Sequence, residues 1–259
     1  MQFFVIKQQH INPTQLPIIE NKITQNNEID RVILTQVTFQ NSEDFNRLIK
    51  LILARPNMRS ITLNSIQLSE NILETLCSVP TSIEQLKIEY CTVDSQAIFA
   101  LPVSPNTTLR ELSISNLIAT ELQLNQLLVS IRSFSCLIML NLAMHLGRFQ
   151  NQISEIIKYC LQLQSLNLTS AVIDEQYLES VLTSIEAHPS IKHLECDAAV
   201  LHKSGHYSNL PDVFFNRVNA VLQSNLSREQ QPPDGQDSLS CFKSLRSSPT
   251  LELKKYTTM

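Results

Sequence analysis

The chain has 259 residues and a formal net charge of −4, and only three of its residues are glycines. Gly147, Gly205 and Gly235 stand far apart, which excludes the G-x-G-x-x-G and G-x-x-x-x-G-K-[ST] phosphate-binding loops. The mixed charges argue against the basic surface that nucleic-acid binding requires. Hydrophobic residues make up 43% of the chain, which is enough for a large core and argues against overall disorder.

We expect residues 1–28 to form an N-terminal cap. The apolar run Phe3–Ile6 predicts a first strand, and Ile18–Ile23 predicts a short helix. The run has no basic leader, so we expect no secretory signal peptide. No stretch of the chain approaches the roughly 20 apolar residues that cross a bilayer, so we also expect no membrane span.

One pattern recurs through the middle of the chain. It is L-x-x-L-x-L, with Ile, Val, Met or Cys in place of some leucines, and its seven copies start 25 to 29 residues apart. Self-similarity at such a period is the signature of stacked repeats. The three apolar positions of the copies are Ile29/Val32/Leu34, Met58/Ile61/Leu63, Ile83/Leu86/Ile88, Leu109/Leu112/Ile114, Leu137/Leu140/Leu142, Leu163/Leu166/Leu168 and Ile191/Leu194/Cys196.

Each copy continues into a segment with the 3.6-residue periodicity of an amphipathic helix. Helix starts are predicted at Ser42, Ser69, Asp94 and Asp174, because their side-chain oxygens can cap free backbone N–H groups. The turns between strand and helix carry asparagine, serine and aspartate in place of glycine. The sequence therefore predicts about seven strand–helix units over residues 29–210.

This pattern resembles the leucine-rich repeat family, in its longer ribonuclease-inhibitor-like type, over roughly residues 29–200. The resemblance implies an α/β fold: a leucine-rich repeat solenoid, or right-handed α/β horseshoe, with a parallel sheet on the concave face and helices on the convex face. The polar turn residue of the family is matched by Cys91, whereas His145 departs from it. Stacking also has a physical reason, since one strand–helix unit cannot bury its own apolar face.

The C-terminal part divides into a helix and a tail. Residues 211–226 have an amphipathic pattern that predicts a capping helix over the last repeat. Residues 227–259 are polar and include Pro232, Pro233 and Gly235, which are helix breakers, so the sequence predicts a flexible tail. The small, polar and basic residues of this tail are similar to the translocation signals of bacterial type IV effectors.

Neither the cysteines nor the histidines predict a catalytic site. The six cysteines form no C-x-x-C pair and most lie in apolar runs, which favours buried free thiols in a reducing compartment. The set His193, Cys196, His202 and His206 has the residue types of a zinc site. However, His193 and Cys196 point to opposite faces of a strand, and Cys196 occupies a core position. We therefore expect no metal, no cofactor and no enzymatic activity, with a zinc-dependent hydrolase as an alternative.

What remains is a surface made by the strand residues that alternate with the buried leucines. It is basic at its N-terminal end, acidic at its C-terminal end, and rich in short hydrogen-bonding side chains between. Such a face suits a protein partner whose basic patch docks near residues 193–197. The predicted partner-binding residues are Arg31, Lys87, Glu89, Glu111, Asn141, Asn167, His193, Glu195 and Asp197.

We therefore expect a monomeric protein-interaction module. Abundant glutamine (21) and asparagine (19), together with few unpaired cysteines, are similar to the composition of leucine-rich repeat effectors of intracellular bacterial pathogens. That resemblance implies a cytoplasmic type of protein that is secreted into the host cytoplasm and binds a host protein. An alternative is a substrate adaptor for a ubiquitin ligase, although the F-box-like pair Leu16-Pro17 is not followed by the helices of an F-box.

Overall fold

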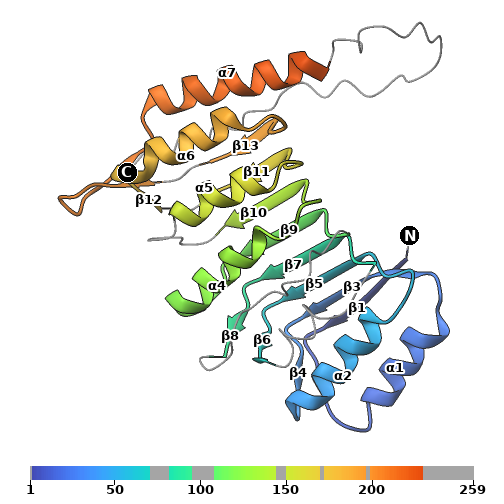
Figure 1. The fold of residues 1–259 in the computed structure, drawn as a ribbon. Helices are drawn as coiled ribbons and strands as arrows, with labels where there is room; N and C mark the ends of the chain where they lie inside the picture. Colours follow the sequence, from blue (N-terminus) through green and yellow to red (C-terminus); the bar gives the residue numbers. More distant parts are fainter. Residues whose placement is uncertain are drawn as a thin grey trace, which may run out of the picture.

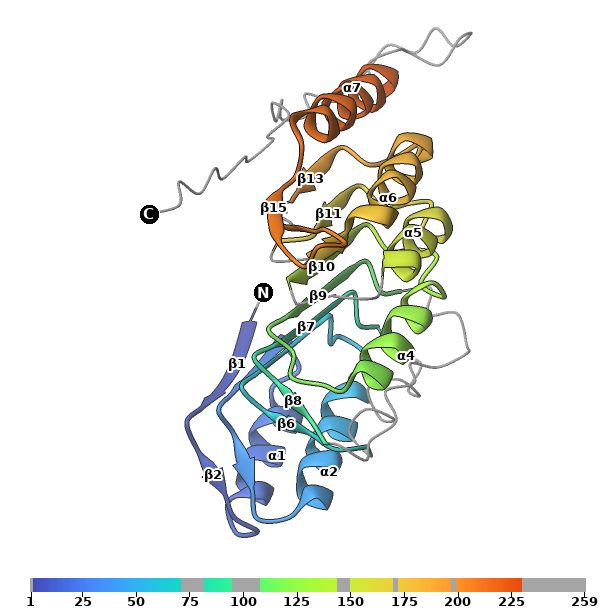
Figure 2. The ribbon, with the colours of Figure 1, turned by 90° about the vertical axis from the view of Figure 1, so that its left-hand side faces the viewer.

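The structure is a computed structural model and describes residues 2–70, 82–94, 108–143, 150–169, 172–196 and 199–229. It is an α/β solenoid of leucine-rich repeats, in which a parallel sheet forms one side and helices line the other (Figure 1, Figure 2). The predicted fold class is confirmed. The three apolar positions of all seven copies are buried, so the repeated pattern does supply a continuous core.

The main sheet has eight strands in the order β1-β3-β5-β7-β9-β10-β11-β13, and each neighbouring pair is parallel. The N-terminal segment contributes β1, in which Phe4 and Ile6 pair with Val32 and Leu34 of the next strand. The strands are β1 (Gln2–Lys7), β3 (Ile29–Thr35), β5 (Ser60–Asn64), β7 (Gln85–Glu89), β9 (Glu111–Ser115), β10 (Met139–Ala143), β11 (Ser165–Asn167) and β13 (His193–Glu195).

Short strands follow several of the main strands. β2 (His10–Ile11) pairs with β4 (Thr38–Phe39), and β6 (Gln67–Leu68) pairs with β8 (Thr92–Val93). Near the C-terminal end, β12 (Val172–Asp174), β14 (Ala199–Leu201) and β15 (Tyr207–Asn209) form a three-stranded sheet. The last two of these strands make an antiparallel hairpin beside the main sheet.

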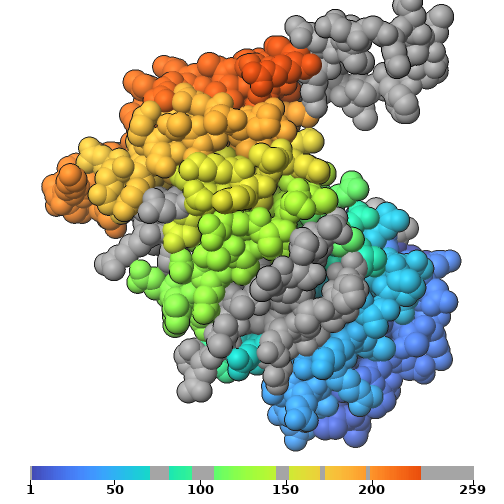
Figure 3. All heavy atoms as spheres, in the orientation of Figure 1, coloured from blue at the N-terminus to red at the C-terminus, as the bar shows by residue number. Residues whose placement is uncertain are grey.

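The described helices are α1 (Leu16–Gln25), α2 (Ser42–Leu53), α4 (Glu121–Ile131), α5 (Gln150–Tyr159), α6 (Glu175–Ala187) and α7 (Asp212–Glu229). In the space-filling view, α4 to α7 stack side by side as successive bands of colour (Figure 3). Leu16 and Pro17 begin α1, which belongs to the first strand–helix unit and is linked to α2 by an ion pair of 2.5 Å between Glu20 and Arg47.

The helix starts differ in detail from the expected caps. Asn41, and not Ser42, caps α2, because its side-chain oxygen accepts the N–H of Asp44 at 2.8 Å. Asp174 is the N-cap residue of α6, but its side chain makes no capping hydrogen bond. The helices expected after Ser69 and Asp94 lie outside the described residues.

The turns that end the main strands explain how the fold manages with so little glycine. In the turns that the structure describes, five non-glycine residues have φ between 48° and 54°: Gln8, Gln36, Ser65, Tyr90 and Asn116. Each donates its N–H, at 2.9 Å, to the carbonyl oxygen of the last residue of the next strand. A left-handed conformation costs a non-glycine residue about 1–2 kcal/mol, and this ladder of hydrogen bonds offsets that cost.

The last helix runs further than expected. The sequence predicted a helix over 211–226, whereas α7 spans Asp212–Glu229. Residues 227–229 contain no helix breaker, and the Ser227 hydroxyl donates to the carbonyl of Gln223 at 2.8 Å within the helix. The side-chain amide of Asn225 is buried and donates to the carbonyls of His188 and Ile191, at 3.1 and 2.8 Å. This contact fixes α7 on the turn that precedes β13.

Candidate partner-binding face

The strand side chains that alternate with the core residues lie on one side of the main sheet, here called the sheet face, where most of them are exposed or half-buried and Ser60 is buried. The pairing register aligns these side chains in three columns, because each residue lies beside its equivalent in the next strand. The first column runs Phe3, Arg31, Ser60, Gln85, Glu111, Met139, Ser165, His193. The second runs Val5, Ile33, Thr62, Lys87, Ser113, Asn141, Asn167, Glu195. The third contains Lys7, Thr35, Asn64, Glu89, Ser115 and Ala143.

The N-terminal end of the sheet face is both apolar and basic. The side chains of Phe3 and Val5 are 57% and 43% exposed, and Lys7 is exposed beside them. The Arg31 guanidinium carbon lies 5.7 Å from the centre of the Phe3 ring, in a cation–π contact. Sequence reasoning missed the three β1 residues as part of this face. The signal was present, since Phe4-x-Ile6 matches the L-x-L half of the repeat.

The middle of the sheet face carries charges of both signs. Lys87 lies between Thr62 and Ser113 in the register, and Glu111 lies between Gln85 and Met139. Glu89 accepts a hydrogen bond from the side-chain amide of Asn64, with 3.1 Å between Nδ2 and Oε2. The middle of the sheet face therefore presents positive and negative side chains at defined positions, and its charge is not of one sign.

Two neighbouring amides, Asn141 and Asn167, lie side by side in the register and donate in opposite directions. Asn141 Nδ2 donates to the hydroxyl of Ser113 at 3.1 Å, and Asn167 Nδ2 donates to Glu195 Oε2 at 2.5 Å. Within the described residues, Asn141 Oδ1 is buried and has no hydrogen-bond partner.

The C-terminal end of the face holds His193 and Glu195, both on β13 and both half-buried. Asn167 fixes one carboxylate oxygen of Glu195. Asp197, the third residue of the predicted docking patch, lies outside the described residues. The structure therefore places two of the three residues on one strand of the face.

The four residues whose types would suit a zinc site lie on different elements. His193 belongs to the main sheet and Cys196 is buried, while His202 and His206 stack on each other in the β14–β15 hairpin, 4.4 Å between ring centres. His202 already contacts Glu175 at 3.1 Å and Ser208 at 2.8 Å. Among the described residues, no group of three or more His, Cys, Asp or Glu side chains could hold a metal ion.

Cys91, Cys136 and Cys160 are free thiols. Cys91, Cys160 and Cys196 are buried and Cys136 is half-buried. Burial raises the pKa of the Cys160 thiol to about 11, and burial likewise raises the pKa of Cys91. These thiols are therefore protonated at neutral pH and are poor nucleophiles.

No protein-family model matches the chain, and no curated protein matches it. A solved protein from Bacteroides fragilis is similar with a TM-score of 0.46 and 11% sequence identity, over 84% of this chain and 72% of that one. An internalin, InlF, from Listeria monocytogenes has a TM-score of 0.42 and 13% identity, over 67% of this chain and 50% of its own. These likenesses are too weak to add to what the sheet itself shows. None of the described helices has the length and apolarity needed to cross a membrane.

Proposed function

We propose that this chain binds a protein partner through the sheet face. One observation carries the proposal: side chains of varied chemistry stand in register across eight parallel strands, while the described helices lie on the other side (Figure 2). A long face of this kind can contact a partner over many strands at once. The main-chain scaffold holds those side chains in place, which lowers the entropy that binding must cost.

The C-terminal end of the face supports a partner with a basic patch. Glu195 is held by Asn167, so its second carboxylate oxygen is presented in a fixed position. Asp197 follows two residues later and adds negative charge to the same segment. Complementary charge at such a place steers encounter and fixes the register of docking.

The finer part of the proposal is that the chain is a secreted bacterial effector acting on a host protein. Its support is the resemblance of the repeats and of the glutamine- and asparagine-rich composition to leucine-rich effectors. The segment after α7 would then carry the export signal. Deletion of residues 230–259 leaves α7 whole, so the truncated protein should fold normally and fail only to leave the producing cell.

The binding proposal is tested by removing single charges. Glu195→Gln keeps the amide contact of Asn167 and removes the charge, and Glu43→Gln removes one exposed charge from the helix side. We expect Glu195→Gln, and more strongly the double reversal of Glu195 and Asp197 to Lys, to reduce capture of the partner from host-cell lysate. Glu43→Gln should capture it as the unchanged chain does. Equal capture by all variants would show that the acidic patch is not the docking site.

A further inference from the structure

The eight-stranded sheet has an open edge at β1. Among the described residues, β1 pairs with β3 on one side and with no strand on the other. At the opposite end of the solenoid, by contrast, α7 packs over the last repeat. An edge strand that carries exposed apolar residues is a template for pairing with another chain, and natural proteins either cover such an edge or use it.

The backbone groups of this edge point outward in a regular way. Gln8 donates its N–H to the carbonyl of Thr35 on β3, so the carbonyl of Lys7, on the same peptide plane, points away from β3. In a strand, the N–H and C=O groups of every second residue lie on one side. Phe3, Val5 and Lys7 therefore direct their backbone donors and acceptors toward the open edge.

Two exposed side chains at this end are apolar, since Phe3 and Val5 are exposed on the sheet face. The end of the solenoid also has a hollow of about 600 Å³, which is lined by Phe3, Phe4, Ile29 and polar residues from Lys22 to Glu28. Ile18 of α1 is exposed and stands two positions, about 200° around a helix, from Glu20, whose carboxylate faces α2. Ile18 thus lies away from α2, on the outer end of the stack.

In contrast to the monomer expected from the sequence, we propose that this edge pairs with the β1 strand of a second copy of the same chain, antiparallel about a two-fold axis through Val5. In that register Val5 lies opposite Val5, and Phe3 lies opposite Lys7 of the other copy. The outward N–H and C=O groups of Phe3, Val5 and Lys7 then meet in the pattern of an antiparallel ladder. The interface is isologous, because each copy contributes the same strand.

The charges around β1 complement each other under this symmetry. The start of the strand is acidic, since Asp30 accepts the N–H of Gln2 at 3.1 Å and Glu28 contacts the Gln2 side chain. The end of the strand is basic, since Lys7 is exposed and forms no ion pair with an acidic side chain of the described part of the chain. An antiparallel pair brings the basic end of each copy to the acidic end of the other. Two parallel strands would instead place like charges together.

The test compares two substitutions of equally exposed residues on the same face. Val5→Lys places two ammonium groups opposite each other on the axis, and like charges directly opposite destabilise a strand pair. Met139→Lys, in the interior strand β10, changes an apolar residue of the same 43% exposure away from the edge. We expect sedimentation equilibrium of the full chain, with its N-terminus unmodified, to show a monomer–dimer equilibrium. Val5→Lys should weaken it about fivefold, and Met139→Lys should leave it unchanged.

Hydrogen exchange keeps the proposal testable if Val5→Lys does not fold. The amides of Val5 and Lys7 in the unchanged chain should exchange quickly in dilute solution and become protected as the protein concentration rises. A chain that stays monomeric up to about 1 mM overturns the proposal. Protection of these amides at every concentration also overturns it, because another part of the same chain would then cover the edge.

Discussion

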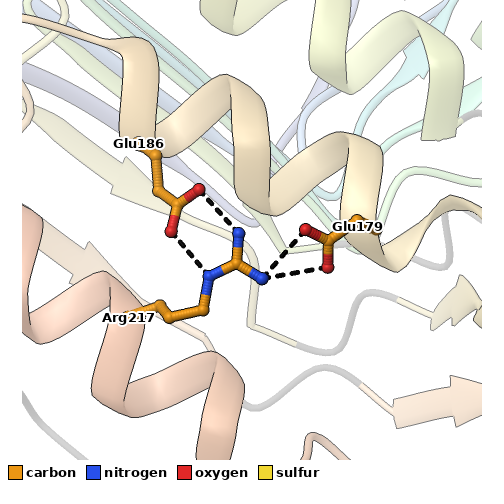
Figure 4. Close-up of polar contacts among 3 residues, drawn as sticks. All are labelled: Glu179, Glu186 and Arg217. Carbon is orange, nitrogen blue, oxygen red and sulfur yellow. Dashed lines mark hydrogen bonds and ion pairs between the residues drawn. The ribbon is translucent and has the colours of Figure 1, made fainter.

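Arg217 of α7 and Glu186 of α6 form two parallel hydrogen bonds, Nε to Oε1 and Nη2 to Oε2, each 2.7 Å long (Figure 4). The remaining nitrogen, Nη1, donates to both carboxylate oxygens of Glu179, at 2.9 and 3.0 Å. Only a planar guanidinium can bind two carboxylates in this way. The hydrogen bonds from Arg217 are the main cause that lowers the pKa of Glu186. The last helix is therefore fixed to the last repeat by geometry as well as by apolar packing.

Arg217→Lys should lower the midpoint of thermal denaturation at pH 7, although it keeps the charge, because an ammonium group cannot replace the paired bonds. The pKa of Glu186 is lowered in the folded chain, so its contribution is present above the ordinary carboxyl pKa of about 4.5. That contribution is lost as the pH falls below this value. The variant and the unchanged chain should thus converge in acid. Arg228→Lys on the same helix is the control. Equal midpoints of thermal denaturation for both variants at pH 7 would contradict the role of the paired hydrogen bonds of Arg217.

His188 should make the fold sensitive to mild acid. Its ring is buried, its Nδ1 accepts the N–H of Ser190 at 3.2 Å, and its Nε2 lies 3.1 Å from the carbonyl of Cys160. Burial lowers the pKa of His188, so the neutral form is the folded form. Stability should be full above the unfolded pKa of about 6.5 and fall below it by up to about 1.4 kcal/mol per pH unit. The fall should end at the lowered pKa of the folded state.

The expected fall in stability is checked by measuring denaturant midpoints from pH 7.5 to pH 5. His188→Gln should be less stable than the unchanged chain at pH 7.5 but show a flatter pH profile. His10→Gln, at an exposed position on β2, should keep the slope. If the stability of His188→Gln still falls between pH 7.5 and pH 5, another titratable group causes the pH dependence.

At the left-handed turns, glycine should stabilise the fold relative to alanine, whereas in a helix alanine should stabilise it relative to glycine. At Tyr90, where φ is 54°, Gly should be more stable than Ala by about 1 kcal/mol. At Tyr159, the last residue of α5, φ is not positive, so Ala should be more stable than Gly. The two tyrosines are 59% and 58% exposed, so they are matched in the surface that is lost. Urea denaturation of the four variants measures both differences, and the same sign at both sites would contradict the strain at the turn.

The thiols should react in an order set by burial. Cys136 is half-buried and should be alkylated first, while Cys91, Cys160 and Cys196 should react slowly in the folded chain. With a pKa of about 11, only about 10⁻³ of the Cys160 thiol is ionised at pH 8. Mass spectrometry of alkylated peptides gives the rate for each residue. Labelling of Cys160 as fast as Cys136 would mean that the core between α4 and α6 opens readily.

The repeat pattern predicted much of the fold because burial and strand period are local properties. Leu140 and Leu142 had to face the core, so Asn141 between them had to face solvent, and the pairing register aligns Asn141 with Asn167. The structure added what spacing cannot show. That Asn167 donates to Glu195 while Asn141 donates to Ser113 depends on side-chain rotation.

The ends of the solenoid were harder to predict for a different reason. β1 carries only the second half of the repeat pattern, so the sequence places Phe3, Val5 and Lys7 in a cap and not on the sheet face. Asn41 competes with Ser42 as a cap because both side chains offer an oxygen to the first turn of α2. Which of the two caps the helix is decided by the backbone angles of the turn before it.

The ladder of left-handed turns also determines how the molecule can change its length. Each turn N–H finds its acceptor in the next unit, so a whole unit can be duplicated or removed and the ladder still closes. A single residue inserted into a main strand would instead send every following side chain of that strand to the opposite side. The size of the sheet face can therefore change over evolution in steps of one strand, while the spacing between its columns of side chains stays the same.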